Sequence, residues 1–225
     1  EDIFHDTNEI NYKDKSSYGF IIAIYDQTKS LLSIVDGQQR LGTLQIMVLI
    51  LRSHLKEIAH SLNEQPDEIG LMNEFLFNQS TKEPRFSFNH DDDENWRVNF
   101  VEKRDDSIGT IVTAINQKDM KSNLDTAFLT INTILKKRFD TIEQDIATKI
   151  EGEINTSLGK EILLKQKNYI IKLWDWIRGE SGGYGMRLMV VTEQNPVRAI
   201  ERFDRENNRG LQIKIDDLLR SYLIQ

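Results

Sequence analysis

The sequence has 225 residues, of which 39% are hydrophobic and 29% charged, and its formal net charge is −7. This length and composition indicate a folded, helix-rich globular protein and exclude a disordered chain. The acidic balance argues against a broad DNA-binding face. Because cysteine is absent, disulfide frameworks and cysteine-ligated metal centres are excluded, and a reducing cytoplasm is the expected location. The longest apolar run, residues 46–51, is far shorter than the ~20 residues of a membrane span, so no membrane partner is expected.

Two segments rich in β-branched residues open the chain. Residues 19–24 (GFIIAI) and 31–35 (LLSIV) predict strands, and the polar DQTK between them predicts a hairpin turn. Apolar residues then recur every three or four positions from Leu41 to Leu55, which predicts a helix directly after the second strand.

The middle of the chain is expected to be mostly helical. Pro66 is placed as the first residue of a helix running to about Phe77, and the acidic run at 91–94 favours another helix N-terminus. Further helices are predicted over 123–139 and 160–178, whereas residues 85–88 (RFSF) predict a short strand.

The last part returns to strand and helix. After a glycine-rich break at 179–185, residues 186–192 (MRLMVVT) predict a buried strand, Asn195-Pro196 opens a helix, and 215–223 starts a final one. This order predicts an α+β fold with a small mixed sheet and a large, mostly helical remainder.

We expect one domain over 1–225, with a strand-turn-helix core at 1–62, a helical insertion at 63–180 and returning elements at 186–225. Because the sequence starts at Glu1 and stops inside a predicted helix, we expect it to be truncated at both ends.

Residues 33–44 (SIVDGQQRLGTL) join a strand end, a glycine turn and a helix start. Gly37 can adopt backbone angles closed to other residues and lets a ligand approach the main chain. The helix beginning near Arg40 offers N–H groups and a partial positive charge, and the guanidinium adds a planar fork for two phosphate oxygens.

Three further polar residues of this segment suit phosphate chemistry. Asp36 could hold Mg²⁺ through a water or orient a nucleophilic water, and Gln38 and Gln39 could place that water or read a base or ribose. The segment thus predicts a nucleotide or phosphoester site. A plain structural corner, with Asp36 capping the helix, is the alternative.

The string IVDGQQRLGTL at 34–44 closely resembles the signature of the DGQQR-motif family, the GmrSD-like restriction endonuclease N-terminal domains. Downstream, residues 190–192 (VVT), 207–211 (NNRGL) and 216–220 (DDLLR) resemble the family's second block in order and separation. The resemblance implies a ParB/sulfiredoxin-like fold. It also implies nucleotide binding and hydrolysis within a modification-dependent, type IV-like restriction or anti-phage defence protein.

By this resemblance, the nucleotide site comprises Asp36, Gly37, Gln38, Gln39 and Arg40. Asp36, Gln38, Gln39 and Arg40 would be catalytic, and Asp36 would also be the metal ligand. The implied cofactors are a nucleoside triphosphate of unspecified base and Mg²⁺.

Thr43, Asn208 and Arg209 are further nucleotide-binding candidates. Asn208-Arg209-Gly210 suits a turn whose arginine reaches a phosphate, and a helix C-cap with a surface ion pair is the equal alternative. Arg209 would face the same pocket if the strand at Val190 lies beside the strand at Val35.

The chain departs from the family pattern at Gly42, where Thr or Ser is common and where glycine weakens the helix start slightly. The family's upstream R-x-Y-x-W segment does not occur before Ser33, and Ile213-Lys214 replaces a common Leu-Ser or Leu-Thr pair.

The implied partners are a nucleotide, DNA through the full-length protein, and a nuclease domain or subunit outside this chain. His54 and His60 are six residues apart, and the four histidines in total form no HNH-type or zinc centre. Two other functions stay open: a module that senses modified DNA without turnover, and a ParB-like nuclease that nicks DNA at Asp36.

Aromatic and basic clusters elsewhere fit structural roles better. Trp174 and Trp176 are expected to pack in a core rather than stack on bases. The basic run Lys136–Arg138 and the acidic run His90–Glu94 are expected to be solvated.

Overall fold

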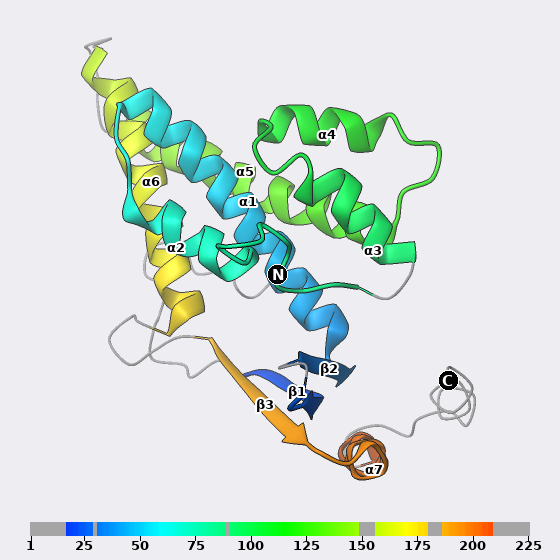
Figure 1. The fold of residues 1–225 in the computed structure, drawn as a ribbon. Helices are drawn as coiled ribbons and strands as arrows, with labels where there is room; N and C mark the ends of the chain where they lie inside the picture. Colours follow the sequence, from blue (N-terminus) through cyan, green and yellow to red (C-terminus); the bar gives the residue numbers. More distant parts are fainter. Residues whose placement is uncertain (1–16, 29–30, 89–90, 149–155, 180–185, 209–225) are drawn as a thin grey trace. The chain divides into compact units, whose positions relative to one another are not determined.

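The computed structural model describes five stretches of the chain: residues 17–28, 31–88, 91–148, 156–179 and 186–208. The chain divides into two compact units (Figure 1). Among the described residues, the sheet unit comprises 17–40 and 187–208, and the helical unit comprises 41–186. A small mixed sheet with a large helical remainder confirms the predicted α+β class.

The segmentation expected at residues 62 and 180 stays a prediction. By compactness, Leu41–Met186 groups with the helices, so the boundaries between the units fall after Arg40 and after Met186.

Three strands form a mixed sheet in the order β2-β1-β3. β1 (Ser17–Asp26) pairs antiparallel with β2 (Leu31–Asp36) and parallel with β3 (Arg187–Glu193). At the turn after β1, the backbone N–H and hydroxyl of Thr28 both donate to Asp26 Oδ1, at 2.9 and 2.6 Å. The predicted strands at 19–24 and 31–35 are confirmed.

Burial in the sheet is concentrated in its middle strand. Ile21, Ile22 and Ala23 of β1 are buried, whereas Val190 of β3 is 47% exposed. The predicted strand at 186–192 therefore exists, but the expectation that it is buried was wrong. β3 lies at an edge of the sheet and has one neighbouring strand.

Helix α7 (Pro196–Asn208) contacts all three strands and buries Ala199. Its start is capped by Asn195, whose Oδ1 accepts the N–H of Val197 at 2.9 Å. The Asn-Pro pair therefore opens a helix as predicted. The helix predicted at 215–223 lies outside the described residues.

The helical unit is built from α2 (Asp67–Leu76), α3 (Asp91–Trp96), the π-helical turn η2 (Arg97–Val101), α4 (Ile108–Asn116), α5 (Asn123–Ala147), α6 (Thr156–Arg178) and most of α1 (Gln38–Leu62). The helices predicted at 41–55, 91–94, 123–139 and 160–178 are confirmed, and most extend further than predicted. Every residue of α1 from Leu44 to Leu55 is buried, so this helix is enclosed on all sides and not only along one stripe.

Three local predictions for this unit need correction. Pro66 is the extended residue before α2, which begins one residue later at Asp67. Residues 85–88 form no strand, because the only ladder contact there is the isolated bridge between Phe77 and Pro84. α4 was not predicted, since its β-branched sequence IGTIVTAIN disfavours a helix by intrinsic propensity.

Aromatic rings explain why residues 85–88 adopt their position. The rings of Phe86 and Phe88 are in contact, with centroids 4.8 Å apart, and Phe88 also contacts Trp96 at 5.6 Å. The series continues through Phe100 to Phe128 of α5. Elsewhere in the unit, Trp174 and Trp176 are 2% and 7% exposed, which confirms the expected core role.

Gly42 lies directly beneath the ring of Phe88. A Cβ atom at this position would stand 2.5 Å from Phe88 Cε1, far inside van der Waals contact. Because Phe86 and Trp96 hold the ring from other sides, the glycine that weakens the helix start also makes room for an aromatic side chain.

We predict that Gly42→Ala lowers the free energy of unfolding, by about 1–2 kcal/mol, because overpacking outweighs the gain in helix propensity. Gly159→Ala is the matched control, since Gly159 lies in α6 with open space around it. It should raise stability by about 0.5–1 kcal/mol. Chemical denaturation of both variants measures the difference. Equal stabilisation by the two substitutions would mean that the Phe88 ring moves aside at no cost.

His54 of α1 is a buried histidine with a structural partner. It is 7% exposed, its Nε2 donates to Asn132 Oδ1 at 2.9 Å, and its ring meets Phe139 edge-on. Burial lowers the pKa of His54 below 6.5, and Lys136 acts in the same direction. The Asn132 hydrogen bond and Glu57 raise the pKa by less.

This lowered pKa makes stability depend on pH. As the pH falls below 6.5, His54 is protonated in the unfolded chain but remains neutral in the folded protein. The free energy of unfolding therefore decreases with falling pH until the pH drops below the folded pKa. One such proton contributes a slope of up to about 1.4 kcal/mol per pH unit. We predict that His54→Gln flattens this slope between about pH 7 and 5, whereas His60→Gln, at an exposed histidine of the same helix, retains it. Denaturation at several pH values is the measurement, and equal slopes in His54→Gln and the parent chain would contradict it.

Candidate functional site

The strand end that carries Asp36 is bent by a β-bulge. β2 advances two residues, from Ile34 to Asp36, where β1 advances only one, so Val35 is the extra residue. Bulges bend a strand and re-aim the side chain next to them. The half-buried Asp36 therefore ends β2 at the point where the strand leaves regular pairing.

Gly37 makes the turn from β2 into α1. Its φ angle is +92°, in the left-handed region that favours glycine. Its backbone N–H donates to Asp36 Oδ1 at 2.7 Å. The carboxylate of Asp36 is therefore oriented by the turn itself, and the predicted use of Gly37 for unusual backbone angles is confirmed.

The two glutamines that open α1 have different surroundings. Gln38 is half-buried, and its Nε2 donates to the carbonyl oxygen of Ile34 at 2.9 Å, which ties the first helical residue back to β2. Gln39 exposes its side chain to solvent. Of the two, Gln39 is therefore the better placed to meet a ligand.

Arg40 is the third residue of α1, and its side chain is 47% exposed. Its Nη1 lies 3.9 Å from Asp36 Oδ2. A pair this long and this exposed contributes only about 0–1 kcal/mol. An incoming anion can therefore compete for the guanidinium of Arg40.

The first turn of α1 contains no acidic residue. The positive end of a helix dipole is usually balanced by Asp or Glu, yet here the first turn carries Arg40. The backbone N–H groups and the guanidinium add their positive potentials, and such an arrangement favours an external anion.

The other predicted ligands remain predictions. Thr43 lies in α1, three residues after Arg40. Asn208 is the last residue of α7, and its side chain, like all of Arg209, lies outside the described residues. The strand at Val190 pairs with β1 and not with β2, so the condition under which Arg209 would face this pocket, that the strands at Val190 and Val35 lie side by side, is not met.

Asp36 fits a magnesium ion that a nucleotide brings with it. Mg²⁺ is commonly held by one or two carboxylates together with phosphate oxygens and waters. The Gly37 N–H occupies only part of the accepting capacity of the carboxylate. Among the described residues, no three His, Cys, Asp or Glu side chains gather closely enough to hold a metal ion by themselves.

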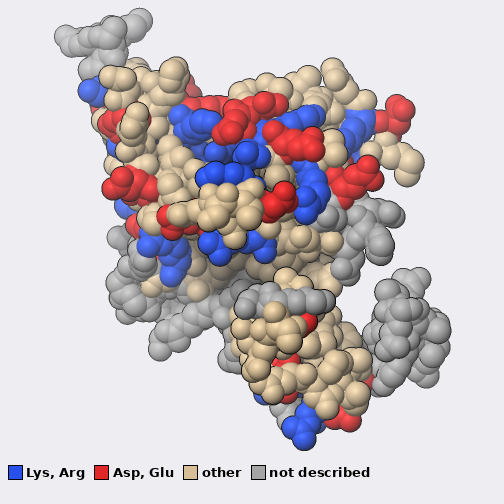
Figure 2. Space-filling model, viewed as in Figure 1, with Lys and Arg blue, Asp and Glu red and all other residues tan. Residues whose placement is uncertain are grey.

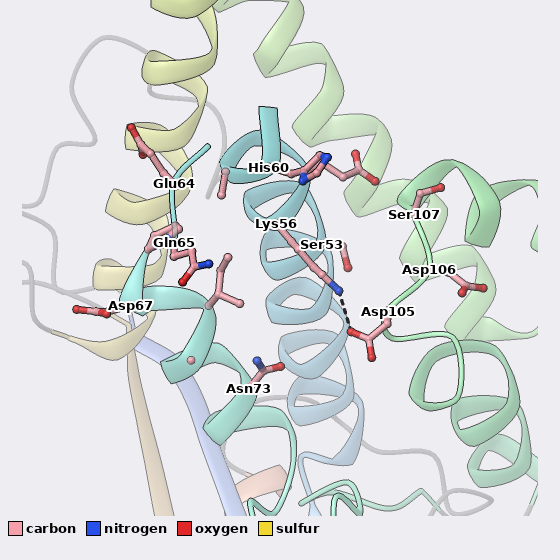
Figure 3. A pocket seen from close by; sticks show the side chains of 15 residues that line it. Ser53, Lys56, His60, Glu64, Gln65, Asp67, Asn73, Asp105, Asp106 and Ser107 are labelled. Atoms are coloured by element: carbon pink, nitrogen blue, oxygen red, sulfur yellow. Dashed lines mark hydrogen bonds and ion pairs between the residues drawn. The ribbon is translucent and has the colours of Figure 1, made fainter. Parts of the chain in front are cut away.

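Described residues of the helical unit line two neighbouring cavities that the sequence did not reveal. The larger, of about 830 Å³, lies between α1, α2 and residues 105–107 (Figure 3). We call it the acidic cavity, after the five carboxylates that line it: Glu57, Glu64, Asp67, Asp105 and Asp106. The buried hydroxyl of Ser53 faces this lining without a hydrogen-bond partner among the described residues.

The smaller cavity, of about 540 Å³, adjoins the first through the shared residues Gly70, Asn73 and Asp105. We call it the basic cavity, because its charged lining consists of three cations and two carboxylates: Arg52, Lys82, Arg104, Glu74 and Asp105. No motif marks either cavity, since the lining residues come from segments far apart in the sequence.

Comparison with known proteins places these features in a family. No helix within the described ranges is both long and apolar enough for a membrane crossing. The fold and the turn define an α+β domain in which a bulged strand passes through a glycine into a helix with a cationic start. The model of the GmrSD restriction endonuclease N-terminal domain matches residues 1–224. Neither the curated proteins nor the solved structures contain a significant match.

The chain therefore belongs to the family of GmrSD restriction endonuclease N-terminal domains, which confirms the family expected from the DGQQR segment. Membership identifies a domain of a restriction-type defence protein.

Proposed function

We propose that this domain binds a nucleoside triphosphate at the turn formed by residues 36–40 and hydrolyses it. Turnover would regulate the nuclease activity of a modification-dependent restriction system. The single observation that carries the proposal is the conjunction of a left-handed glycine, an oriented carboxylate and an exposed arginine within one helix start.

Phosphate recognition rests on the start of α1. Backbone N–H groups at a helix N-terminus have no intrahelical acceptor and point along the axis toward an approaching anion. Arg40 adds two parallel donors that match phosphate oxygens. The first turn of the helix carries no acidic residue, and Asp36, whose Oδ2 lies 3.9 Å from Arg40 Nη1, offsets part of this potential.

Asp36 would act on the attacking water or on the magnesium ion of the nucleotide. The Gly37 N–H holds its carboxylate in one orientation, and preorganised groups of this kind lower the barrier without moving during the reaction. Bound Mg²⁺ would supply charge neutralisation at the phosphates.

The two glutamines would have different roles in this site. Gln38 is tied to Ile34 by its amide nitrogen, so it steadies the corner. The exposed Gln39 would hold the water or contact the ribose or base. We include Thr43, Asn208 and Arg209 as residues of the same site only through the family resemblance.

We predict that Arg40→Ala weakens binding of a non-hydrolysable nucleoside triphosphate by about tenfold or more, because it removes charge-assisted hydrogen bonds. Titration calorimetry measures the affinity. Arg198→Ala is the matched control, since Arg198 is an exposed arginine at the same third position of α7. Equal affinity in Arg40→Ala and the parent chain would remove Arg40 from the site.

We predict that Asp36→Asn keeps nucleotide affinity within a few-fold but lowers phosphate release by about a hundredfold. An asparagine oxygen can still accept the Gly37 N–H, so the turn should persist while the charge is lost. Circular dichroism checks the fold, and release of inorganic phosphate from several nucleoside triphosphates measures turnover. Undiminished release would assign the chemistry to another residue.

The same variant separates the two other functions left open by the sequence. Plasmid nicking that disappears in Asp36→Asn would identify a nuclease at this turn. Retention of modified DNA without any phosphate release would identify a sensing module.

A further inference from the structure

The basic cavity of the helical unit has an unusual floor. Arg52 of α1 is only 4% exposed, and three acceptors from two segments, α2 and residues 104–105, satisfy its guanidinium. Nε donates to Asn73 Oδ1 of α2 at 2.5 Å, Nη1 donates to the carbonyl oxygen of Arg104 at 2.6 Å, and Nη2 donates to Asp105 Oδ1 at 3.1 Å. A buried guanidinium costs several kcal/mol unless it is paired in this way.

The carboxylate that pairs with Arg52 is shared among several cations. Asp105 also accepts from Lys56 Nζ at 2.9 Å, and its other oxygen lies 3.9 Å from Arg104 Nε. The hydrogen bond from Lys56 is the largest of the contributions that lower the pKa of Asp105. Figure 3 shows the Lys56 side chain extended toward Asp105. One negative charge therefore faces three positive ones, and the cluster retains positive potential.

The rim of the basic cavity adds to this potential. Lys82, in the turn after α2, has no ion pair within the described part of the chain, and its own backbone N–H donates to the Asn78 carbonyl. Glu74, the second carboxylate of the lining, accepts a hydrogen bond from the Gln79 amide. Figure 2 shows Lys and Arg side chains gathered over α1 and α2 in this face of the helical unit, with carboxylates among them.

The adjoining acidic cavity differs from the basic cavity in the charge of its lining. Its five carboxylates face one lysine and one histidine in the lining. An anion would be repelled there, whereas in the basic cavity cations outnumber carboxylates. The two cavities share Asn73 and Asp105, so the wall between them separates regions of opposite potential.

We propose that the basic cavity is a phosphate-binding site, separate from the turn at 36–40, with Lys82 and Arg104 as its ligand-contacting cations and Arg52 as its buried floor. Arg104 lies 5.5 Å over the ring of Phe77, which fixes its guanidinium at the rim. Asn78 accepts the N–H groups of Ser80 and Thr81 with its side-chain oxygen, so its amide hydrogens complete the donor set. A volume of about 540 Å³ holds a phosphate with part of its ester.

Two sources can supply this chemistry: the phosphates of a free nucleotide, and the phosphodiester backbone of DNA. The test uses the full chain carrying Arg40→Ala, so that binding at the turn is suppressed and the outcome does not depend on the proposed hydrolysis. The probes are pyrophosphate, by calorimetry, and a short DNA duplex, by fluorescence anisotropy at several salt concentrations.

We predict that Lys82→Gln and Arg104→Gln, each added to this background, weaken binding of the preferred probe by about five- to tenfold. If the duplex is preferred, each substitution should also reduce the slope of log affinity against log salt by about one. Both residues lie at the rim, so the fold should survive, and circular dichroism verifies it. Preference for pyrophosphate identifies a nucleotide as the source, and preference for the duplex identifies DNA.

Lys137→Gln is the matched control, because Lys137 is an exposed cation of α5 in the same unit, outside both cavities. It should leave affinity and salt slope unchanged. An equal loss in all three variants would show general surface attraction and overturn the proposal. Absence of binding by both probes at millimolar concentration would overturn it as well.

Discussion

The left-handed backbone of Gly37, with φ +92°, is the constraint on which the DGQQR segment depends. It lets the bulged end of β2 pass within one residue into a helix, so the strand's last side chain and the helix's first turn lie together. A side chain at this position would add strain of about 1–2 kcal/mol. The positions of Asp36 and Arg40 therefore depend first on the backbone conformation that glycine permits, and the roles that we propose for them depend on it as well.

The helix that begins at this turn imposes a second constraint further along. Because α1 is enclosed on all sides from Leu44 to Leu55, its polar residues must find partners inside the helical unit. His54 obtains Asn132 of α5, and Arg52 obtains Asn73 together with residues 104–105. Each partner fixes a different neighbouring element against α1. The walls of the basic cavity therefore follow from pairing one buried guanidinium. Of the two cations at its rim, Arg104 also donates to the Val101 carbonyl at 2.9 Å, whereas Lys82 has no ion pair within the described residues.

Local signals in the sequence were sufficient for most elements and for the turn itself. Runs of β-branched residues on either side of a polar turn predicted β1 and β2, and Asn195-Pro196 predicted the start of α7. The remaining features depend on contacts between residues far apart in the sequence and were therefore not predicted. Residues 85–88 look like a strand, but Phe86 and Phe88 are held by ring contacts with each other and with Trp96, and no strand lies beside them. α4 has poor helix propensity, yet Ile108, Ile111 and Ile115 are buried at helical spacing, and Ser107 caps it. Packing outweighed propensity in both cases. The cavities were invisible because their residues meet only after folding.

A net charge of −7 argues against a broad phosphate-binding face, but it does not decide what a pocket binds. Charges more than about 8–10 Å away are largely screened at physiological ionic strength, whereas partly buried charges are screened much less. Binding of an anion depends on the balance of positive and negative charge within a few ångströms of it. At the start of α1 that balance favours an anion through backbone N–H groups and one arginine. In the basic cavity it does so through side chains around a buried guanidinium. An acidic chain can therefore carry local sites for phosphates, as we propose for these two places.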